Sequence, residues 1–382
     1  MKEITRGNVG AIKSELQDKI LVLYGAATAG HQVLELLSDL KITADFFVDD
    51  DKGKQGNIIE GLKVLSFDEL KILSQNNKVA VILSSVFSGS ILKKLKTISV
   101  ECYEMYDMLY NDCVNAAEEC LTLKQDKASW DKKWRDVNNF LYDENSKRIW
   151  ELMRYVADTR NVVKEQFMAI CSPEEHYFVK PIKDLLTADS VLVDCGAYTG
   201  DMLGQLCNNK IPFGKIHEIE ANPLNREKIL KQISTLNFEG KVIVHNCGLC
   251  DHDGEMNFFI NHENSAGSRF VSNESESKLN RGGQIVKIPT RKLDDIITEK
   301  IDFLKTDIEG AEMSALRGGK NLIVNSRPIL AISIYHSLDD VVDIPCYLNA
   351  LLKNYKFFVR HHSFTLGETV LYGIPVEKLE VN

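Results

Sequence analysis

The chain holds two groups of short apolar segments, and within each group the segments are separated by stretches long enough to form a helix. The first group consists of ILVLYG (20–25), ADFFVDD (44–50) and KVAVILSS (78–85). Apolar runs of this length predict strands buried on both faces, and helix-length connections predict right-handed βαβ units in a parallel sheet. Residues 1–111 are therefore expected to form a Rossmann-like α/β domain.

The second group lies in residues 190–382 and predicts a longer sheet. Its segments are VLVDCG (191–196), KIHEIEA (215–221), KVIVHN (241–246), IDFLKTD (301–307) and ILAISIYH (329–336). The final stretch, 356–375, predicts two antiparallel strands joined by a short turn around Leu366 and Gly367. A parallel sheet that ends in an antiparallel hairpin is typical of the class I methyltransferase fold, and a nicotinamide-type Rossmann domain usually lacks the hairpin.

Residues 112–189, between the two groups, contain no glycine and show no strand pattern. Aromatic residues recur here, and Trp150, Met153, Val156 and Ala157 are spaced to share one face of a helix. This much apolar and aromatic surface is not typical of a flexible linker. We expect a helical connector that makes tertiary contacts.

Charge and hydropathy exclude several classes of protein. The net charge of −9 removes any electrostatic reason to expect nucleic-acid binding. The longest apolar runs, such as 79–83, are far shorter than the roughly 18 residues of a membrane-spanning helix, and the N-terminal segment lacks the apolar centre of a signal peptide. We expect a cytoplasmic protein without a membrane span, in which the nine cysteines are reduced thiols. A homo-oligomer is left open.

Four residues of the types that bind zinc lie within eight positions: His245, Cys247, Cys250 and His252. Structural zinc sites usually draw their ligands from two separate loops. These four residues instead fall on one strand end and the turn that follows it. We interpret them as a strand end with buried thiols, and a zinc site is the alternative.

A first glycine-bearing turn, Gly25 to Gly30, follows the first predicted strand and opens a helix, as a dinucleotide site requires. The middle glycine of the usual GxGxxG pattern is Ala27 here, which hinders close approach of a pyrophosphate. Asp49 lies near the position of the acid that binds ribose. The alternatives are a bound dinucleotide, or a Rossmann-like domain kept for sugar-nucleotide or partner recognition, or for architecture.

A second glycine-bearing turn follows the strand VLVDCG. Gly196 and Gly200 lack a Cβ, so the backbone between them can pass close to a ligand. Asp194 ends the strand where an α/β sheet presents its ligand crevice, and its carboxylate suits an ammonium group, directly or through water. The cofactor-binding residues expected in this turn are Asp194, Gly196, Ala197, Tyr198, Thr199, Gly200 and Asp201.

The next two strands end in further polar residues. Glu220 ends the second strand, where a carboxylate can accept both hydroxyls of a ribose, and Asn222 follows it. The third strand ends at Asn246, whose surroundings would flank an adenine. Successive strand ends thus supply groups suited to the amino acid, the ribose and the base of a nucleoside cofactor.

The fourth strand ends at Asp307, and Glu309 and Glu312 follow within the next five residues. Three acids at the mouth of a crevice are costly unless positive charge balances them, and a sulfonium cofactor, a cationic substrate or a divalent metal could do so. We expect Asp307 to face the site and to contact the cofactor or the acceptor. Glu312 is expected in the solvated first turn of a helix, where the helix dipole favours acids.

With these residues in place, the C-terminal half resembles the FkbM family of methyltransferases. The matching strings are VDCGAYTGD, EIEANP, GLCDHDGEMNF, RKLDDI, IDFLKTDIEGAE, ALRGG and RPILAISIYH. They cover nearly all of residues 190–375. The resemblance implies a class I fold, S-adenosylmethionine as methyl donor, and an oxygen acceptor on a sugar, glycan, polyketide or other small secondary metabolite. The N-terminal part resembles the leading region of longer family members, where a Rossmann-like domain similar to those ahead of sugar-modifying acyltransferases precedes the catalytic domain.

Transfer of a methyl group to a hydroxyl requires a base as well as alignment. His336 ends the fifth strand, and its ordinary pKa of about 6.5 suits proton transfer. His336 is therefore expected to be the general base, although a histidine that only bonds to the backbone is an alternative. His361 and His362 on the hairpin are further candidates. Asp307 could serve instead, by orienting the acceptor or by binding Mg²⁺.

The segment 261–283 is rich in serine, asparagine and glycine, and is interpreted as a loop that covers or selects the acceptor. A surface loop of no consequence is the alternative. Two other functions are kept open. One is an NAD-dependent enzyme that modifies a nucleotide sugar through the turn Gly25 to Gly30, and the other is a non-catalytic binding protein on the same fold.

Overall fold

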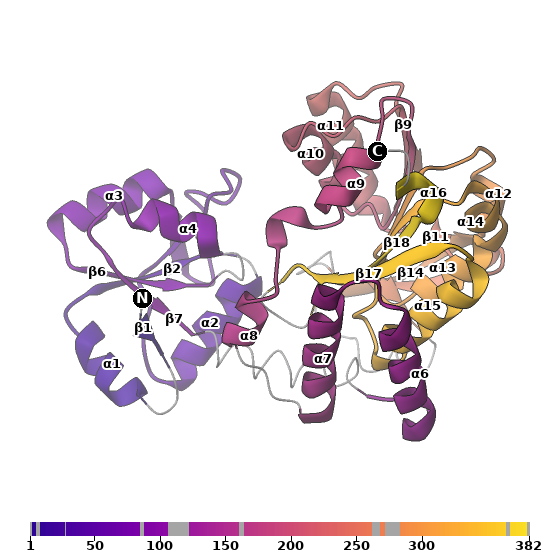
Figure 1. Cartoon of the computed structure of the whole chain (residues 1–382). Coiled ribbons are helices and arrows are strands. Elements are labelled where there is room, and N and C mark those ends of the chain that lie inside the picture. The colour runs from indigo at the N-terminus through magenta and orange to yellow at the C-terminus, as the bar shows by residue number, and fades with distance from the viewer. Residues whose placement is uncertain are drawn as a thin grey trace. The chain divides into compact units, whose positions relative to one another are not determined.

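A computed structural model shows how the chain folds (Figure 1). It describes residues 2–4, 8–26, 28–84, 88–105, 122–159, 164–261, 268–271, 283–363 and 367–379. The chain divides into two compact units. The first consists of 1–118, 160–169 and 363–365, and the second of 119–159, 170–362 and 366–382.

The first unit is a seven-stranded sheet with helices on both faces (Figure 1). The sheet has the order β1-β7-β6-β2-β3-β5-β4, and every neighbouring pair is parallel except β4 with β5. Its strands are β1 (Lys2–Glu3), β2 (Ile20–Tyr24), β3 (Phe46–Val48), β4 (Ile58–Ile59), β5 (Leu62–Leu65), β6 (Val79–Leu83) and β7 (Glu101–Glu104). Its helices are α1 (Val9–Leu16), α2 (Thr28–Asp39), α3 (Phe67–Asn76), α4 (Ser88–Leu95) and α8 (Lys164–Met168).

Two separate cores hold this first sheet. Successive side chains of a strand point to opposite faces, so Leu21 and Leu23 of β2 pack with α1 and α2, whereas Val22 and Tyr24 pack with α3 and α4. The fully apolar strands expected from the sequence are the consequence of burial on both faces. The prediction of a Rossmann-like parallel sheet is confirmed for this unit.

The second unit contains a sheet with the order β10-β9-β8-β15-β16-β18-β17. In the order of the chain, this is a 3-2-1-4-5-7-6 arrangement in which β18 is antiparallel to both of its neighbours. The strands are β8 (Val191–Cys195), β9 (Lys215–Ile219), β10 (Val242–His245), β15 (Phe303–Thr306), β16 (Ile329–Ser333), β17 (Tyr355–His361) and β18 (Thr369–Pro375). The expected parallel sheet with a terminal antiparallel hairpin is confirmed, although part of the turn, including Leu366, lies outside the described residues.

The helices of the second unit connect and cover these strands. Two of them, α10 and α11, pack on one face beside β8 and β9, and contribute Leu203, Leu206 and Ile229 to its main core. The helices are α6 (Lys127–Phe140), α7 (Glu144–Thr159), α9 (Lys180–Leu185), α10 (Asp201–Asn208), α11 (Pro223–Leu236), α12 (Leu293–Ile296), α13 (Glu312–Gly318), α14 (Lys320–Ser326), α15 (Leu338–Leu351) and α16 (Val376–Leu379), with the 3₁₀ helix η1 (Pro173–Glu175). No described helix of the chain is long and apolar enough to cross a membrane.

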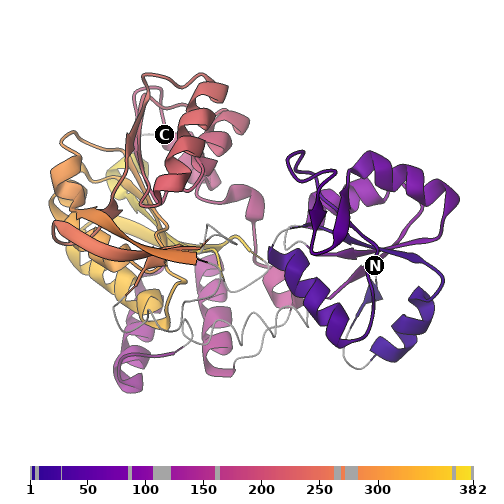
Figure 2. The same cartoon turned by 180° about the vertical axis from the view of Figure 1, so that it is seen from behind.

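The insertion between β10 and β15 forms a small sheet of its own, seen in orange in Figure 2. Its order is β11-β14-β12-β13, from β11 (Gly248–Leu249), β12 (Gly254–Asn261), β13 (Arg269–Phe270) and β14 (Gly283–Arg291). The two strand-like pieces expected in the insertion pair along their length as β12 and β14. Most of the segment 261–283 lies outside the described residues, so its role as a cover for the acceptor stays a prediction.

The aromatic segment before β8 packs on the second unit. Trp130 in α6 donates a hydrogen bond to the carbonyl oxygen of Leu338 at 2.7 Å, and Trp150 in α7 donates to that of Trp134 at 3.2 Å. The rings of Trp134 and Trp150 stack with centroids 4.1 Å apart. The helical character expected for this segment is seen, but α6 and α7 belong to the second unit and do not stand apart as a connector. The buried aromatic rings are the physical reason.

Replacing Trp150 by alanine should lower the free energy of unfolding of the second unit by about 3–5 kcal/mol, because a large buried ring is removed. Trp150→Phe keeps a ring beside Trp134 and should lose less. Urea unfolding followed by tryptophan fluorescence would report on this unit alone, because all three tryptophans of the chain lie in α6 and α7. Equal stability of Trp150→Ala and the parent chain would contradict this account of the helices.

Candidate active site

The carboxyl ends of β8, β9, β15 and β16 carry most of the residues that the sequence singled out. The loop from Gly196 to Gly200 lies between β8 and α10, at the point where strand order reverses between β8 and β15. Gly196 has φ +89°, and a Cβ on it would lie 1.8 Å from the carbonyl oxygen of Asp307. Gly200 has φ +88° and caps α10. The two glycines therefore let this loop turn tightly against the end of β15.

Glu220, just after β9, holds the same loop from the other side. One of its carboxylate oxygens accepts a hydrogen bond from the backbone N–H of Tyr198 at 2.8 Å, and the other accepts from that of Asn222 at 2.7 Å. The side chain of Asn246 donates to the carbonyl oxygen of Glu220 at 2.9 Å. Burial raises the pKa of Glu220 to about 7 despite the two backbone bonds. The structure thus brings together four of the residues predicted to bind a cofactor.

Each oxygen of the Glu220 carboxylate has two lone pairs, and the two backbone bonds use one on each. The oxygen that accepts from Asn222 also accepts a long bond from the side chain of Asn225 at 3.5 Å, and the oxygen that accepts from Tyr198 keeps its second lone pair. The carboxylate can therefore still accept hydrogen bonds from a ligand. The side chain of Asn222 has a structural role. It accepts the backbone N–H of Leu224 at 3.0 Å and caps α11. Thr199 donates to Asp201 in the same loop.

Asp194 is buried under the loop from Gly196 to Gly200 and does not face solvent, because only 1% of its surface is exposed. Its carboxylate is 2.8 Å from the ammonium group of Lys305 on β15. That ammonium also donates to the carbonyl oxygen of Gly196 at 2.7 Å and lies 5.1 Å from the centre of the Tyr177 ring. Asp194 thus acts on the glycine loop through Lys305, and its contact with a ligand's ammonium group stays a prediction.

Local sequence patterns do not single out Lys305 and Glu218, because strand register is a tertiary property. Asp194 pairs in register with Glu218 of β9 on one side and with Lys305 of β15 on the other. The three buried charged groups therefore form a row across the centre of the sheet. Burial and the neighbouring Asp194 raise the pKa of Glu218 well above its ordinary value, which favours its neutral form. Lys305 then has one close anionic partner in the row, Asp194.

Asp307 lies just after β15 and receives two tyrosine hydroxyls. Tyr177 donates to it at 2.6 Å and Tyr335 at 3.1 Å. Burial alone would raise the pKa of Asp307, but the charges of His336 and Lys305 and the bond from Tyr177 hold it below its ordinary value. Asp307 is therefore an ionised carboxylate with fixed orientation. Neither tyrosine was singled out in the sequence, because both reach Asp307 from distant positions in the chain.

His336 lies among three carboxylates. Its ring nitrogens are 3.0 Å from a Glu312 oxygen, 3.4 Å from Asp307 and 3.7 Å from Glu309. Burial alone would lower the pKa of His336, but the three acids raise it to about 10. A protonated imidazole cannot accept another proton, so this geometry does not support the general-base role expected from the sequence.

The sequence predicted that Glu312 lies in the solvated first turn of a helix, and this prediction is wrong. It is the first residue of α13 but is 0% exposed, and it accepts the backbone N–H of Ile308 at 2.7 Å. Glu309 has φ +56° in the preceding turn, and burial raises its pKa to about 7. The acids that follow β15 fold back toward the sheet because this turn passes through two successive left-handed residues, Glu309 and Gly310.

The other histidines predicted as alternatives have structural bonds. His361 shares a hydrogen bond with Thr369 at 2.9 Å. His362 contacts the carbonyl oxygen of Ser172 and the hydroxyl of Tyr372, both at 2.8 Å, and burial lowers its pKa to about 3. Both side chains hold the end of the hairpin in place.

The four residues weighed as a zinc site do not form one group. Among the described residues, Cys250 and His252 gather with Asp251, whereas His245 lies 3.0 Å from His217 instead. A second group that could hold a metal ion consists of Asp307, Glu312 and His336.

In the first unit, Gly25 has φ +115° and its loop is bound by Asp49, which accepts the backbone N–H of Ala26 at 2.8 Å. Lys54 lies 3.1 Å from the same carboxylate oxygen. Burial opposes ionisation, but the backbone bonds and Lys54 lower the pKa of Asp49. Its partners within the chain leave less capacity for a ribose than Glu220 has. Ala27 lies outside the described residues.

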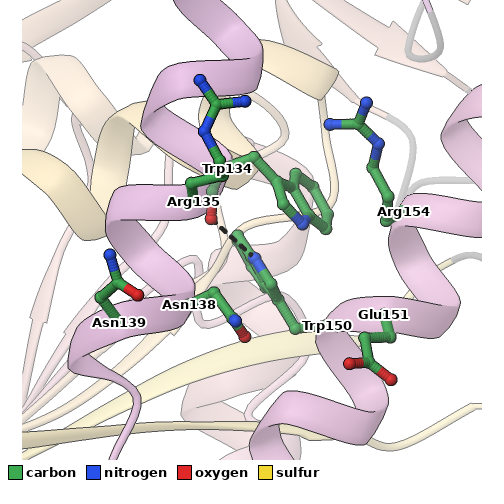
Figure 3. Close-up of a pocket in the computed structure, with 7 residues that line it drawn as sticks. All are labelled: Trp134, Arg135, Asn138, Asn139, Trp150, Glu151 and Arg154. Atoms are coloured by element: carbon green, nitrogen blue, oxygen red, sulfur yellow. Dashed lines mark hydrogen bonds between the residues drawn. The ribbon is translucent and has the colours of Figure 1, made fainter.

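A pocket of about 300 Å³ lies on the hairpin of α6 and α7 (Figure 3). The stacked rings of Trp134 and Trp150 line it together with polar side chains. They are Arg135, Asn138, Asn139, Glu151 and Arg154. None of these residues belongs to the carboxyl edge of the sheet, so we treat this pocket separately from the candidate active site.

The 3-2-1-4-5-7-6 sheet defines the class: the second unit has the fold of a class I methyltransferase. The whole chain is similar to the crystal structure of methyltransferase FkbM from Methylobacillus flagellatus KT, with a TM-score of 0.54 and 22% identity over 95% of this chain and 92% of that chain. Residues 194–358 match the family model of the methyltransferase FkbM domain. This part of the second unit is therefore similar to the methyltransferase domains of the FkbM family.

Two further similarities cover parts of the chain. Methyltransferase 1 of Beauveria bassiana (strain ARSEF 2860) is 27% identical over 172 residues, which are 41% of this chain and 65% of that relative. Residues 6–103 match the family model of a C-methyltransferase C-terminal domain. The first unit is thus similar to a domain that accompanies methyltransferases, and the nicotinamide alternative is not favoured.

Replacing Lys305 by methionine should lower the free energy of unfolding of the second unit by about 3–5 kcal/mol near neutral pH, because Asp194 is left buried without its cation. The loss should shrink at low pH, where Asp194 takes up a proton. The double variant Asp194→Asn with Lys305→Met should recover most of the stability. Urea unfolding followed by tryptophan fluorescence measures both, and equal losses in the single and double variants would rule out the ion pair as the cause.

Proposed function

We propose that the second unit transfers the methyl group of S-adenosylmethionine to a hydroxyl oxygen of a sugar, a glycan or a small secondary metabolite. The main support for S-adenosylmethionine as the donor is the buried Glu220 carboxylate. It accepts the backbone N–H of Tyr198 in the loop from Gly196 to Gly200, and it retains a lone pair for a ribose hydroxyl. The class I fold and the FkbM domain support the same donor.

In this proposal the cofactor lies along the carboxyl edge of β8, β9 and β10. Its ribose hydroxyls donate to Glu220, its amino-acid end lies over the loop from Gly196 to Gly200, and its adenine lies near Asn246. Lys305 keeps the loop in position by its bond to the carbonyl oxygen of Gly196. The role of Asp194 is then indirect, through Lys305.

The methyl acceptor would meet the acids that follow β15. Among these acids, the side chains of Glu309 and Asp307 are 36% and 18% exposed, whereas that of Glu312 is fully buried. Asp307 has a fixed orientation because Tyr177 and Tyr335 both donate to it, so it can orient an acceptor hydroxyl. Methyl transfer requires nucleophile, methyl carbon and sulfur in line, and oriented groups supply this alignment.

Carbon is the second candidate for the acceptor atom, because residues 6–103 match a domain named for C-methyltransferases. That match covers the first unit and not the catalytic domain, so it bears on the accompanying domain more than on the chemistry. Incubation with isotopically labelled methyl donor and a panel of hydroxylated acceptors, with NMR of the product, would distinguish an O-methyl from a C-methyl group. A C-methyl product would overturn the oxygen assignment.

Calorimetry with S-adenosylhomocysteine tests the cofactor site directly. The parent chain should bind one equivalent, and Gly196→Arg should abolish binding because its side chain would enter the loop where Gly196 meets Asp307. Arg148→Ala, in α7, serves as a control variant that should bind normally. If the parent chain does not bind S-adenosylhomocysteine although circular dichroism shows that it is folded, the proposal is wrong.

The affinity for S-adenosylhomocysteine should also depend on pH through Glu220. Its pKa is raised to about 7, so the acid is protonated below that value and must ionise to accept both ribose hydroxyls well. Affinity should therefore rise with pH through this value and then level off. Glu220→Gln should bind more weakly, with a flat profile over the same range. A parent profile as flat as that of the variant would show that Glu220 does not contact the ligand.

A further inference from the structure

Asp307, Glu312 and His336 form a compact group at the acceptor end of the site. They come from the residue after β15, the first residue of α13 and the segment after β16. One ligand atom from each lies within 4.8 Å of the other two. We propose that these three side chains bind a divalent cation.

The separations between these residues suit a shared ion. Two ligands at about 2.1 Å from one ion are roughly 3 Å apart when adjacent and roughly 4.2 Å apart when opposite. Nδ1 of His336 is 3.0 Å from Glu312, and Nε2 is 3.4 Å from Asp307. An ion would take only one of these nitrogens, which would then be adjacent to one carboxylate and within 4.8 Å of the other. At 3.7 Å from His336, Glu309 is close enough to assist.

Unpartnered polar atoms are an independent indication. The side chain of His336 is only 9% exposed, yet neither ring nitrogen has a hydrogen-bond partner of acceptable geometry in the described part of the chain. The second carboxylate oxygen of Glu312 is likewise buried without such a partner. Buried polar groups are normally satisfied, and an ion would satisfy one nitrogen of His336 and the Glu312 carboxylate at once.

The net negative charge of this group also favours a bound cation. Even with a proton on His336, one imidazolium cannot neutralise both Asp307 and Glu312. Lys305 is near Asp307, but its ammonium group already binds Asp194 and the carbonyl oxygen of Gly196. A divalent cation would remove the excess negative charge.

The ligand types define the class of ion. One imidazole and two carboxylates suit Mn²⁺, Fe²⁺ or Zn²⁺ better than Ca²⁺ or Mg²⁺, which prefer oxygen ligands only. If the proposed function holds, the ion would also bind the acceptor hydroxyl and make its proton easier to remove. The proton passes to a carboxylate or to water, the oxygen forms the new bond to the methyl carbon, and the electrons of the broken carbon–sulfur bond stay on sulfur as S-adenosylhomocysteine forms.

Titration of the full chain with Mn²⁺ after chelator treatment, followed by electron paramagnetic resonance of the free ion, tests this site. The parent chain should bind one Mn²⁺ that Zn²⁺ displaces. Glu312→Gln and Asp307→Asn should each weaken binding by more than about tenfold. The matched control is Asp251→Asn, which changes an exposed acid beside Cys250 and His252 and should leave this binding unchanged.

Calorimetry with S-adenosylhomocysteine on the same samples separates the two proposals. Cofactor binding without Mn²⁺ or Zn²⁺ binding would overturn the cation site and leave the methyl-transfer proposal standing. Mn²⁺ binding that Asp307→Asn weakens, without cofactor binding, would support the cation site and remove the proposed function. Mn²⁺ binding that is equal in the parent chain and in both Asp307→Asn and Glu312→Gln would also overturn the cation site.

Discussion

The contact between Lys305 and the glycine loop is the interaction on which the candidate site depends. One buried ammonium group neutralises Asp194 and bonds to the carbonyl oxygen of Gly196, so it ties β15 to the loop that follows β8. These two strands flank the point where strand order reverses, which is where a parallel sheet opens a crevice. Because Gly196 also lies against the carbonyl oxygen of Asp307, the loop from Gly196 to Gly200 directly contacts the acidic segment that follows β15.

The two units have similar parallel sheets, but the acids at the carboxyl edges of these sheets have different surroundings. In each, an acid at the end of the second predicted strand accepts a backbone N–H of the glycine loop: Asp49 from Ala26, and Glu220 from Tyr198. Asp49 also has Lys54 beside it, which lowers its pKa, whereas burial raises the pKa of Glu220 to about 7. Lys54 thus stabilises the charge of Asp49, whereas burial disfavours the charge of Glu220.

The acidic segment after β15 changes the interpretation of His336. In the sequence it is a histidine at a strand end, and its ordinary pKa suggested a base. In the fold, three carboxylates surround it and favour a positive charge at its position. A proton supplies that charge, and the proposed metal ion would supply it in place of the proton.

Periodicity and strand-end motifs predicted both sheets, the terminal hairpin and the positions of Gly196, Glu220 and Asp307, because buried strands need apolar runs and tight turns need glycine. The sequence alone therefore determined the fold class and the edge of the sheet that carries the candidate site. Only the tertiary structure revealed the row of Glu218, Asp194 and Lys305, the tyrosines on Asp307 and the burial of Glu312. These features depend on strand register and on turns that reverse side-chain direction, and neither can be deduced from local patterns.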